Sequence, residues 1–337
     1  MKKIPILLVL ALLSASILSL PSVFSNTTSA PYIGETAQKD SQNVSHDPIE
    51  DNAVPPPPDL QPDDVTETPT GTPQIDELII IRMEASDVHR GNLILINYEY
   101  NYDIPEANDF VLIAEEMTTS YKVTGAYMLL STAIIGSLND MMDAFYEETE
   151  RDNITIRSAF RDYASQQEIL NYYISIYGQV GALRWASAPG HSEHHAGIAF
   201  DFGVDDNGVL RAFTNTGVNA WFAQNSWKYG FTLRYPDGKT DITGVANEPW
   251  HFRYVGLPHA QIMYENDWCL EEYIEILMEY TQDEPFHFPQ DDTTYEIFYA
   301  ADTEIKIPFD CEYEVSGNNI EGFIVTLMLP TPARTEN

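Results

Sequence analysis

The sequence predicts an α+β fold, with a small antiparallel sheet, flanking helices and a C-terminal β-rich extension. Strand-like and helical segments follow one another without a regular βαβ rhythm, which argues against a parallel α/β sheet. The helical segments repeat their apolar residues at helical spacing, and the tail over residues 295–329 alternates in the manner of strands. No internal repeat is present. These patterns favour a single mixed domain with a β-rich tail.

The elements of the first half follow from local composition. Runs rich in Leu and Ile predict strands over residues 78–81, 93–96 and 154–158. Apolar residues that return to one face predict helices over 131–150 and 163–177. Gly178 is a suitable residue for ending the second helix, because glycine adopts the left-handed cap conformation without strain.

The second half contains shorter elements around an irregular segment rich in Gly, Pro and His. Strands are predicted over residues 198–204, 231–235 and 252–255, and in the tail over 295–299 and 323–327. Helices are predicted over 217–229 and from 257 to about 280.

The N-terminal region predicts export. Lys2 and Lys3 precede an apolar run over residues 4–20, so 1–25 reads as a signal peptide or a retained membrane anchor. Residues 26–75 are rich in Pro, Asp and Thr and predict a disordered spacer. Four parts are therefore expected: residues 1–25, the linker 26–75, a main folded domain over 76–285 and the extension over 286–337.

Charge and cysteine content exclude some functions. The net charge of −35 is incompatible with a surface that neutralises nucleic-acid phosphates. Cys269 and Cys311 are the only cysteines and form no CxxC motif, so thiol chemistry is not expected. In an exported chain one disulfide between them and two free thiols are both open.

Histidines and carboxylates cluster around two short segments. His194 and Asp201 lie in the first segment, and Glu248 and His251 in the second. A zinc hydrolase needs three protein ligands, an open position for water and a nearby base. His194, Asp201 and His251 can supply the ligands, and Glu248 can supply the base.

These residues converge only where the backbone is irregular. On one regular strand His194 and Asp201 would point to opposite faces, because their separation is odd. Gly197 and Pro249 supply the breaks that allow convergence. A solvated histidine loop is the plain alternative, and the motifs HExxH, GxSxG and SxxK are absent.

Four motifs in order carry a family resemblance: SAFRDYASQ at 158–166, PGHSEHHAGIAFD at 189–201, GFTLRYP at 230–236 and EPWHFRYVG at 248–256. Together they resemble the VanY-type D-alanyl-D-alanine carboxypeptidases. The resemblance implies a D,D-peptidase or hedgehog-like fold around a zinc site. It also implies a serine-independent metallo-carboxypeptidase that removes the terminal D-Ala from peptidoglycan stem peptides. A membrane tether through residues 1–25 would hold it at the outer face of the membrane or in the cell wall.

The resemblance also implies roles for single residues. His194, Asp201 and His251 would hold Zn²⁺, and Glu248 would act as general base and then general acid. Arg161 would stabilise the developing oxyanion or hold a substrate carboxylate. The pocket for the terminal D-residue would be lined by Gln166, Ser192 and Tyr235. His191 and His195 are not expected to be ligands, because zinc would then lose its open position.

Departures from the family pattern leave the substrate open. Phe160 stands where a Tyr is usual, Asp162 where a Ser is usual, and Ala196 where a small polar residue is commoner. The alternatives are an L,D-carboxypeptidase acting on tetrapeptides and a non-catalytic wall-binding protein. The export signal disfavours a cytoplasmic D,D-dipeptidase. The tail is open to a role as an accessory module that docks on the wall.

Overall fold

The computed structural model describes residues 78–102 and 109–330. The predicted export segment at 1–25, the linker at 26–75 and the end of the extension at 331–337 lie outside the described residues. All described residues belong to one compact unit. Within these ranges, no helix combines the length and the apolar character needed to cross a membrane.

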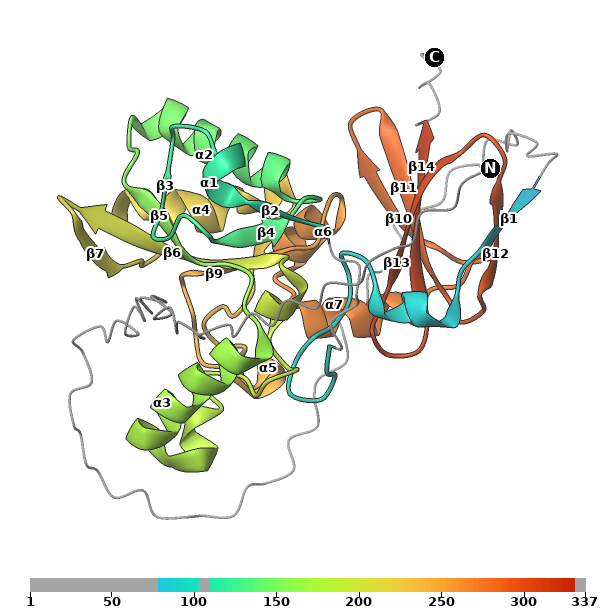
Figure 1. Ribbon diagram of the computed structural model, residues 1–337. Helices are drawn as coiled ribbons and strands as arrows, with labels where there is room; N and C mark the ends of the chain where they lie inside the picture. Colours follow the sequence, from blue (N-terminus) through green and yellow to red (C-terminus); the bar gives the residue numbers. More distant parts are fainter. Residues whose placement is uncertain (1–77, 103–108, 331–337) are drawn as a thin grey trace, which may run out of the picture. The chain divides into compact units, whose positions relative to one another are not determined.

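A mainly antiparallel sheet forms the centre of the domain (Figure 1). Its strands, in spatial order, are β3 (Lys122–Val123), β5 (Ile154–Ser158), β6 (Ala199–Asp206), β9 (His251–Tyr254) and β8 (Phe231–Leu233), with β7 (Val209–Ala212) pairing to β6. Only the β3–β5 pair is parallel. A separate pair joins β2 (Phe110–Leu112) to β4 (Leu129–Ser131). The sheet confirms the predicted strands over 154–158, 198–204, 231–235 and 252–255 to within a few residues.

Helices cover the sheet (Figure 1), and α2 and α3 lie on opposite sides of it. Leu138 and Phe145 of α2 (Ile135–Thr149) are fully buried in the same hydrophobic core as Phe200 and Phe202 of β6. The remaining helices are α1 (Ile113–Glu116), α3 (Tyr163–Ala182), α4 (Ala220–Asn225), α5 (Thr240–Thr243), α6 (His259–Asn266) and α7 (Leu270–Leu277), with 3₁₀ turns η1 (Ala85–His89), η2 (Glu193–Ala196), η3 (Gly217–Asn219) and η4 (Ser226–Tyr229). The aromatic core thus covers the side of β6 that carries Phe200 and Phe202.

The predicted strand over 93–96 is wrong. These residues are buried, but they form an irregular segment without a sheet partner. Their backbone groups bond instead to side chains and loops: Asn319 donates to the Leu95 carbonyl, and Arg253 donates to the Ile94 carbonyl. Buried backbone polar groups must be satisfied, and here long-range side chains replace a strand partner.

Three predicted helices have different bounds. The helix expected over 257–280 is two helices, because Asp267 ends α6 in a left-handed conformation with φ 55° and the extended Cys269 caps α7, which begins at Leu270. The helix expected over 217–229 consists of η3, α4 and η4. The helix expected over 163–177 is interrupted at Gly178 (φ 72°), as predicted, and a further helical stretch beyond this kink extends α3 to Ala182.

The C-terminal strands form two small sheets. One has the order β10 (Phe286–Gln290), β11 (Thr293–Ala300), β14 (Phe323–Pro330) and β13 (Glu312–Gly317). The other pairs β12 (Glu304–Pro308) with β1 (Leu78–Arg82), so the first described strand joins the C-terminal strands. The strands expected over 78–81, 295–299 and 323–327 are therefore present, while the division at residue 286 stays a prediction. Cys269 and Cys311 are free thiols, the second of the two options.

Candidate active site

His194, Asp201 and His251 meet in one buried cluster. One ligand atom from each lies within 4.8 Å of the others. The Asp201 Oδ1 atom is 3.4 Å from His194 Nε2 and 3.0 Å from His251 Nδ1. All three side chains are buried. The three residues that the sequence singled out as ligands therefore come together.

Irregular backbone brings them together, as the sequence predicted. His194 lies in η2, and Gly197 then reverses the chain with φ 67° before β6 begins. Asp201 on β6 is in register with His251, the first residue of β9. A tight turn precedes β9, in which the His251 amide donates to the Glu248 carbonyl. The carboxylate and the second imidazole thus project from neighbouring strands, and η2 adds the first imidazole.

Hydrogen bonds orient both rings. His194 Nδ1 is 2.7 Å from the Ala159 carbonyl, which fixes the proton on Nδ1 and leaves Nε2 for the cluster. His251 Nε2 is 3.3 Å from Glu193 Oε2, which leaves Nδ1 facing Asp201. Outer partners of this kind, a carbonyl and a carboxylate, are those that metal-binding histidines use.

The donor set suits Zn²⁺. Two imidazoles and one carboxylate are a common ligand set of catalytic zinc, with zinc–ligand distances of about 2.0–2.1 Å. Tetrahedral geometry then places ligand atoms about 3.3 Å apart, close to the two spacings observed here. Burial, reinforced by Arg161, lowers the pKa of His194 to about 4, so this ring is neutral and able to coordinate.

The cluster also attracts positive charge. Burial lowers the pKa of His251, but its hydrogen bonds to Asp201 and Glu193 and the nearby carboxylate charges outweigh burial and raise the pKa to about 9. In the absence of a cation, a proton on His251 therefore neutralises the carboxylates. A divalent metal would displace that proton and take over its role.

Glu248 lies beside the cluster without belonging to it. Its Oε2 atom is 3.9 Å from His251 Nδ1, and its amide donates to the Tyr235 carbonyl. Burial and the charge of Asp201 raise the pKa of Glu248 to about 8, against the opposing charges of His251 and two arginines. A carboxylate whose pKa lies near neutrality can both accept and return a proton.

Arg161 is held firmly on the other side of Asp201. Its guanidinium donates to Gln166 Oε1 at 2.7 Å and to Ser158 Oγ at 2.6 Å, and it lies 3.7 Å from Asp201 Oδ2. Gln166 in turn donates to the Ser187 carbonyl. Both ends of the Gln166 amide are therefore occupied, and the side chain positions Arg161.

Ser192 and Tyr235 also reach the site. Ser192 is buried immediately before η2, two residues from His194. The Tyr235 ring lies 5.0 Å from the His251 ring, between their centroids, and is buried. Contact of Gln166, Ser192 and Tyr235 with a substrate stays a prediction.

His191 and His195 do not join the cluster. His195 uses both ring nitrogens, since Nδ1 is 2.6 Å from the Arg161 carbonyl and Nε2 accepts the Gly190 amide. His191 Nδ1 is 2.7 Å from the Asn97 carbonyl. Neither ring belongs to the metal-binding group, in agreement with the sequence analysis.

Sequence reasoning missed Glu193. This fully buried carboxylate receives hydrogen bonds from Arg234 at 2.7 Å and Arg253 at 2.8 Å, and it also contacts His251. Despite burial, these two guanidinium groups hold its pKa well below the usual range. The available signal was the pair of arginines inside apolar strand sequences, since buried arginines need a carboxylate partner.

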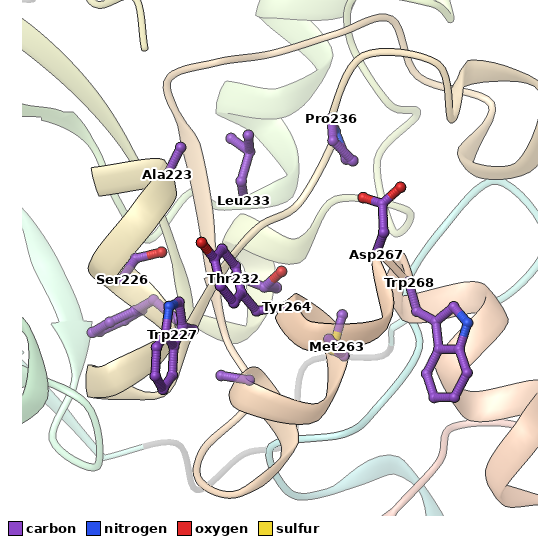
Figure 2. A pocket seen from close by; sticks show the side chains of 12 residues that line it. Ala223, Ser226, Trp227, Thr232, Leu233, Pro236, Met263, Tyr264, Asp267 and Trp268 are labelled. Atoms are coloured by element: carbon purple, nitrogen blue, oxygen red, sulfur yellow. The ribbon is translucent and has the colours of Figure 1, made fainter. Parts of the chain in front are cut away.

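A hollow lies apart from the cluster. It opens between η4, β8 and α6, and Figure 2 shows Trp227 and Tyr264 on its wall, whose rings stack 5.3 Å apart. None of the predicted site residues lines it. The hollow has no converging donor set, so the chemistry is assigned to the buried cluster.

Comparison with known proteins identifies the family. The family described as VanY: D-alanyl-D-alanine carboxypeptidase matches residues 128–257. The chain is 36% identical over 246 residues to a D-alanyl-D-alanine carboxypeptidase of Enterococcus faecium, covering 71% of this chain and 76% of that protein. It is 39% identical over 132 residues to the bifunctional D-Ala-D-Ala dipeptidase and carboxypeptidase VanXYC of Enterococcus gallinarum, covering 38% of this chain and 69% of that protein.

A solved structure agrees. The vancomycin resistance D,D-dipeptidase VanXYg, crystallised with a D-Ala-D-Ala phosphinate analog, matches with a TM-score of 0.67 and 31% identity, over 75% of this chain and 100% of that one. The family match over residues 128–257 contains the buried cluster and the four sequence motifs. The chain therefore belongs to the VanY D-alanyl-D-alanine carboxypeptidase family of peptide hydrolases.

Proposed function

We propose that the protein is an exported, zinc-dependent carboxypeptidase that hydrolyses the terminal D-Ala from peptidoglycan stem peptides. The observation that carries this proposal is the buried His194–Asp201–His251 cluster with Glu248 beside it. The Enterococcus faecium relative is named a D-alanyl-D-alanine carboxypeptidase, and the VanXYg structure holds a D-Ala-D-Ala analog. Both names fit a substrate that ends in D-Ala.

The residues around the cluster divide the chemistry. Zn²⁺, when bound, supplies a Lewis acid that activates water and polarises the scissile carbonyl. Glu248 accepts the proton of the attacking water and returns it to the departing amine of D-Ala. Arg161, fixed by Gln166 and Ser158, presents a guanidinium to the oxygen that becomes negative.

Export follows from the N-terminal sequence. The basic start and apolar run of residues 1–25 would direct the chain across the membrane, and the spacer at 26–75 would let the domain reach the wall. Either cleavage of this segment or its retention as a tether delivers the site to the outer face of the membrane. Its substrate, the peptidoglycan stem peptide, lies there.

The test is incubation with a pentapeptide ending in D-Ala-D-Ala, the corresponding tetrapeptide and free D-Ala-D-Ala, with products read by mass spectrometry. We expect loss of one D-Ala from the pentapeptide. Preferred cleavage of the tetrapeptide would favour the L,D-carboxypeptidase. Preferred cleavage of free D-Ala-D-Ala would favour dipeptidase activity, which the VanXYC relative combines with carboxypeptidase activity by name. No cleavage of any peptide would favour the wall-binding alternative.

A further inference from the structure

A β-bulge lies next to the site at Arg157. Ile156 pairs with Phe202 and Ser158 pairs with Asp201, so the register of β5 against β6 shifts at the residue between them. In a bulge, two residues of one strand oppose a single residue of its partner, and the extra residue re-aims the strand. Arg157 and Ser158 therefore both oppose the proposed ligand Asp201.

The bulge turns Arg157 toward the site. Ile156 is buried in the core with Phe202, whereas the Ser158 hydroxyl bonds to Arg161 on the side of the cluster. Residues two apart on a regular strand share a face, so the bulge produces this change of face. The charge of Arg157 opposes the burial that raises the pKa of Glu248, which places its guanidinium within electrostatic reach of that carboxylate.

The guanidinium of Arg157 is unpaired. The side chain is half-buried, and within residues 78–102 and 109–330 it makes no hydrogen bond or ion pair. Arg161 differs, because it is held by Ser158, Gln166 and Asp201. In a chain with 52 acidic and 17 basic residues, an arginine near the site without a carboxylate partner is unusual and is available to an anion.

Tyr173 offers a second free donor. It lies on α3, half-buried, with its ring stacked on Tyr177 at 6.2 Å between centroids. Burial raises the pKa of its hydroxyl, as does the charge of Glu248, while Arg157 opposes them. Among the described residues this hydroxyl has no hydrogen-bond partner. A guanidinium beside Asp201 on the bulged strand and a phenol on α3, both without a hydrogen-bond partner among the described residues, therefore lie within electrostatic reach of Glu248.

We propose that Arg157, with the Tyr173 hydroxyl as a second donor, binds a carboxylate group of the peptide substrate and so determines substrate affinity. This inference rests on the proposed function, because it names the group that reads that substrate. A guanidinium fork suits a carboxylate, and a charge-assisted hydrogen bond gives both strength and orientation. Arg161 is then left to the reacting carbonyl.

Binding without turnover tests the proposal. The zinc-loaded Glu248→Gln enzyme serves as the parent, and titration calorimetry measures the Kd of a pentapeptide ending in D-Ala-D-Ala. Adding Arg157→Gln should raise Kd by about 10- to 100-fold, the range for losing a hydrogen bond to a charged group. Arg157→Lys should recover part of the affinity, because it keeps the charge but loses the fork. Arg151→Gln, an exposed change just before β5, is the control with the same loss of charge.

Two substrate arms identify the carboxylate. If Arg157 reads the terminal carboxylate, the Arg157→Gln penalty should disappear on a pentapeptide ending in D-alaninamide. If it reads an upstream carboxylate, the penalty should persist there and disappear when an acidic residue within the peptide is replaced by its amide. Either pattern supports a carboxylate subsite.

Three results would overturn it. The first is a Kd for the Arg157→Gln enzyme that equals the parent's for every peptide. The second is an equal loss with Arg151→Gln. The third is an unchanged Kd together with a lower kcat and a displaced pH profile when Arg157→Gln is made in the enzyme with native Glu248. That result would make Arg157 a positioning residue for Glu248. Failure of the proposed function would look different: the enzyme with native Glu248 would release no D-Ala whether or not peptide binding depends on Arg157.

Discussion

Glu248 is the side chain whose replacement separates metal binding from catalysis. It lies 3.9 Å from His251 but outside the group of three residues that could hold a metal. Glu248→Gln keeps its shape and removes its proton-accepting oxygen. We expect zinc content to be unchanged and kcat to fall by about 100-fold or more, as for the loss of a general acid–base. Metal analysis and steady-state kinetics check this.

The acid side of the pH profile belongs to the same prediction. Glu248 accepts a proton only when ionised, so activity should fall as pH decreases through its pKa, and this limb should change in the variant. Loss of zinc from Glu248→Gln with normal activity per bound metal would make Glu248 a ligand or a structural residue.

Glu193 is the residue whose loss should cost most stability. Its side chain and those of Arg234 and Arg253 are completely buried. Glu193→Gln leaves two guanidinium groups with one fewer charged partner, and we expect the free energy of unfolding to fall by about 3 kcal/mol. Urea denaturation measures it. Glu304→Gln, which breaks an exposed ion pair with Arg82, should change it by less than about 1 kcal/mol. Equal effects would contradict the account.

The sequence pointed to the three proposed ligands but not to the residues that support them. His194, Asp201, Glu248 and His251 were recognisable because residue type and spacing point to zinc chemistry. The roles of Gln166 as a brace for Arg161 and of Glu193 as a partner of His251 depend on contacts between distant segments. Local patterns do not encode such contacts, although arginines within apolar strands indicate that an acid must be nearby.

At the scale of elements, Gly197 connects η2 to β6 and so positions His194. It has φ 67°, and a Cβ there would lie 2.3 Å from Cε1 of Phe110. Gly197→Ala should therefore displace η2 and weaken zinc binding by about tenfold or more, as when outer support of a ligand is lost. A fluorescent chelator competition measures the affinity.

Gly208→Ala is the matched control for this substitution. Gly208 has φ 86° in the β6–β7 turn, and no atom lies within 4 Å of a Cβ there. Both variants should lose about 1 kcal/mol of stability from backbone strain, but only Gly197→Ala should lose zinc affinity. Equal zinc affinity in the two variants would show that η2 does not depend on this glycine.

Helices and strands were predicted correctly where the apolar periodicity extends over many residues. The predictions failed where contacts with distant segments determine the local structure. The central strands and α2 carry clear patterns and were confirmed. The segment 93–96 is as apolar as a strand, but Arg253 and Asn319 satisfy its carbonyls, so no strand forms. The break between α6 and α7 comes from Asp267 in a left-handed conformation, which periodicity does not reveal.

At the scale of the whole molecule, His259 joins three elements. Its ring on α6 bonds to Tyr273 of α7 at 2.8 Å and to Thr326 of β14 at 3.1 Å. Burial lowers its pKa to about 3. The unfolded chain therefore takes up the proton first, so the stability provided by the neutral ring is complete above about pH 6.5 and is lost as pH falls toward 3.

At pH 5, protonation of this one group in the unfolded chain should lower the free energy of unfolding by about 2 kcal/mol. The free energy of unfolding should therefore fall less between pH 7.5 and pH 5 in His259→Gln than in the native chain. This holds whatever the stability of the variant is at pH 7.5. Urea denaturation at both values measures the difference, with the exposed His287→Gln as control. An identical pH dependence in the native chain and His259→Gln would contradict a neutral buried ring.

The most direct test of the central claim is a zinc titration of the metal-free enzyme, with D-Ala release from a pentapeptide measured at each step. Activity should be absent without metal, rise in proportion to bound zinc and reach its maximum at one zinc per chain. The His194→Ala/Asp201→Ala/His251→Ala variant should neither bind zinc nor release D-Ala, provided that its circular dichroism shows a folded chain. D-Ala release by the metal-free enzyme, or stoichiometric zinc in the triple variant, would contradict the account.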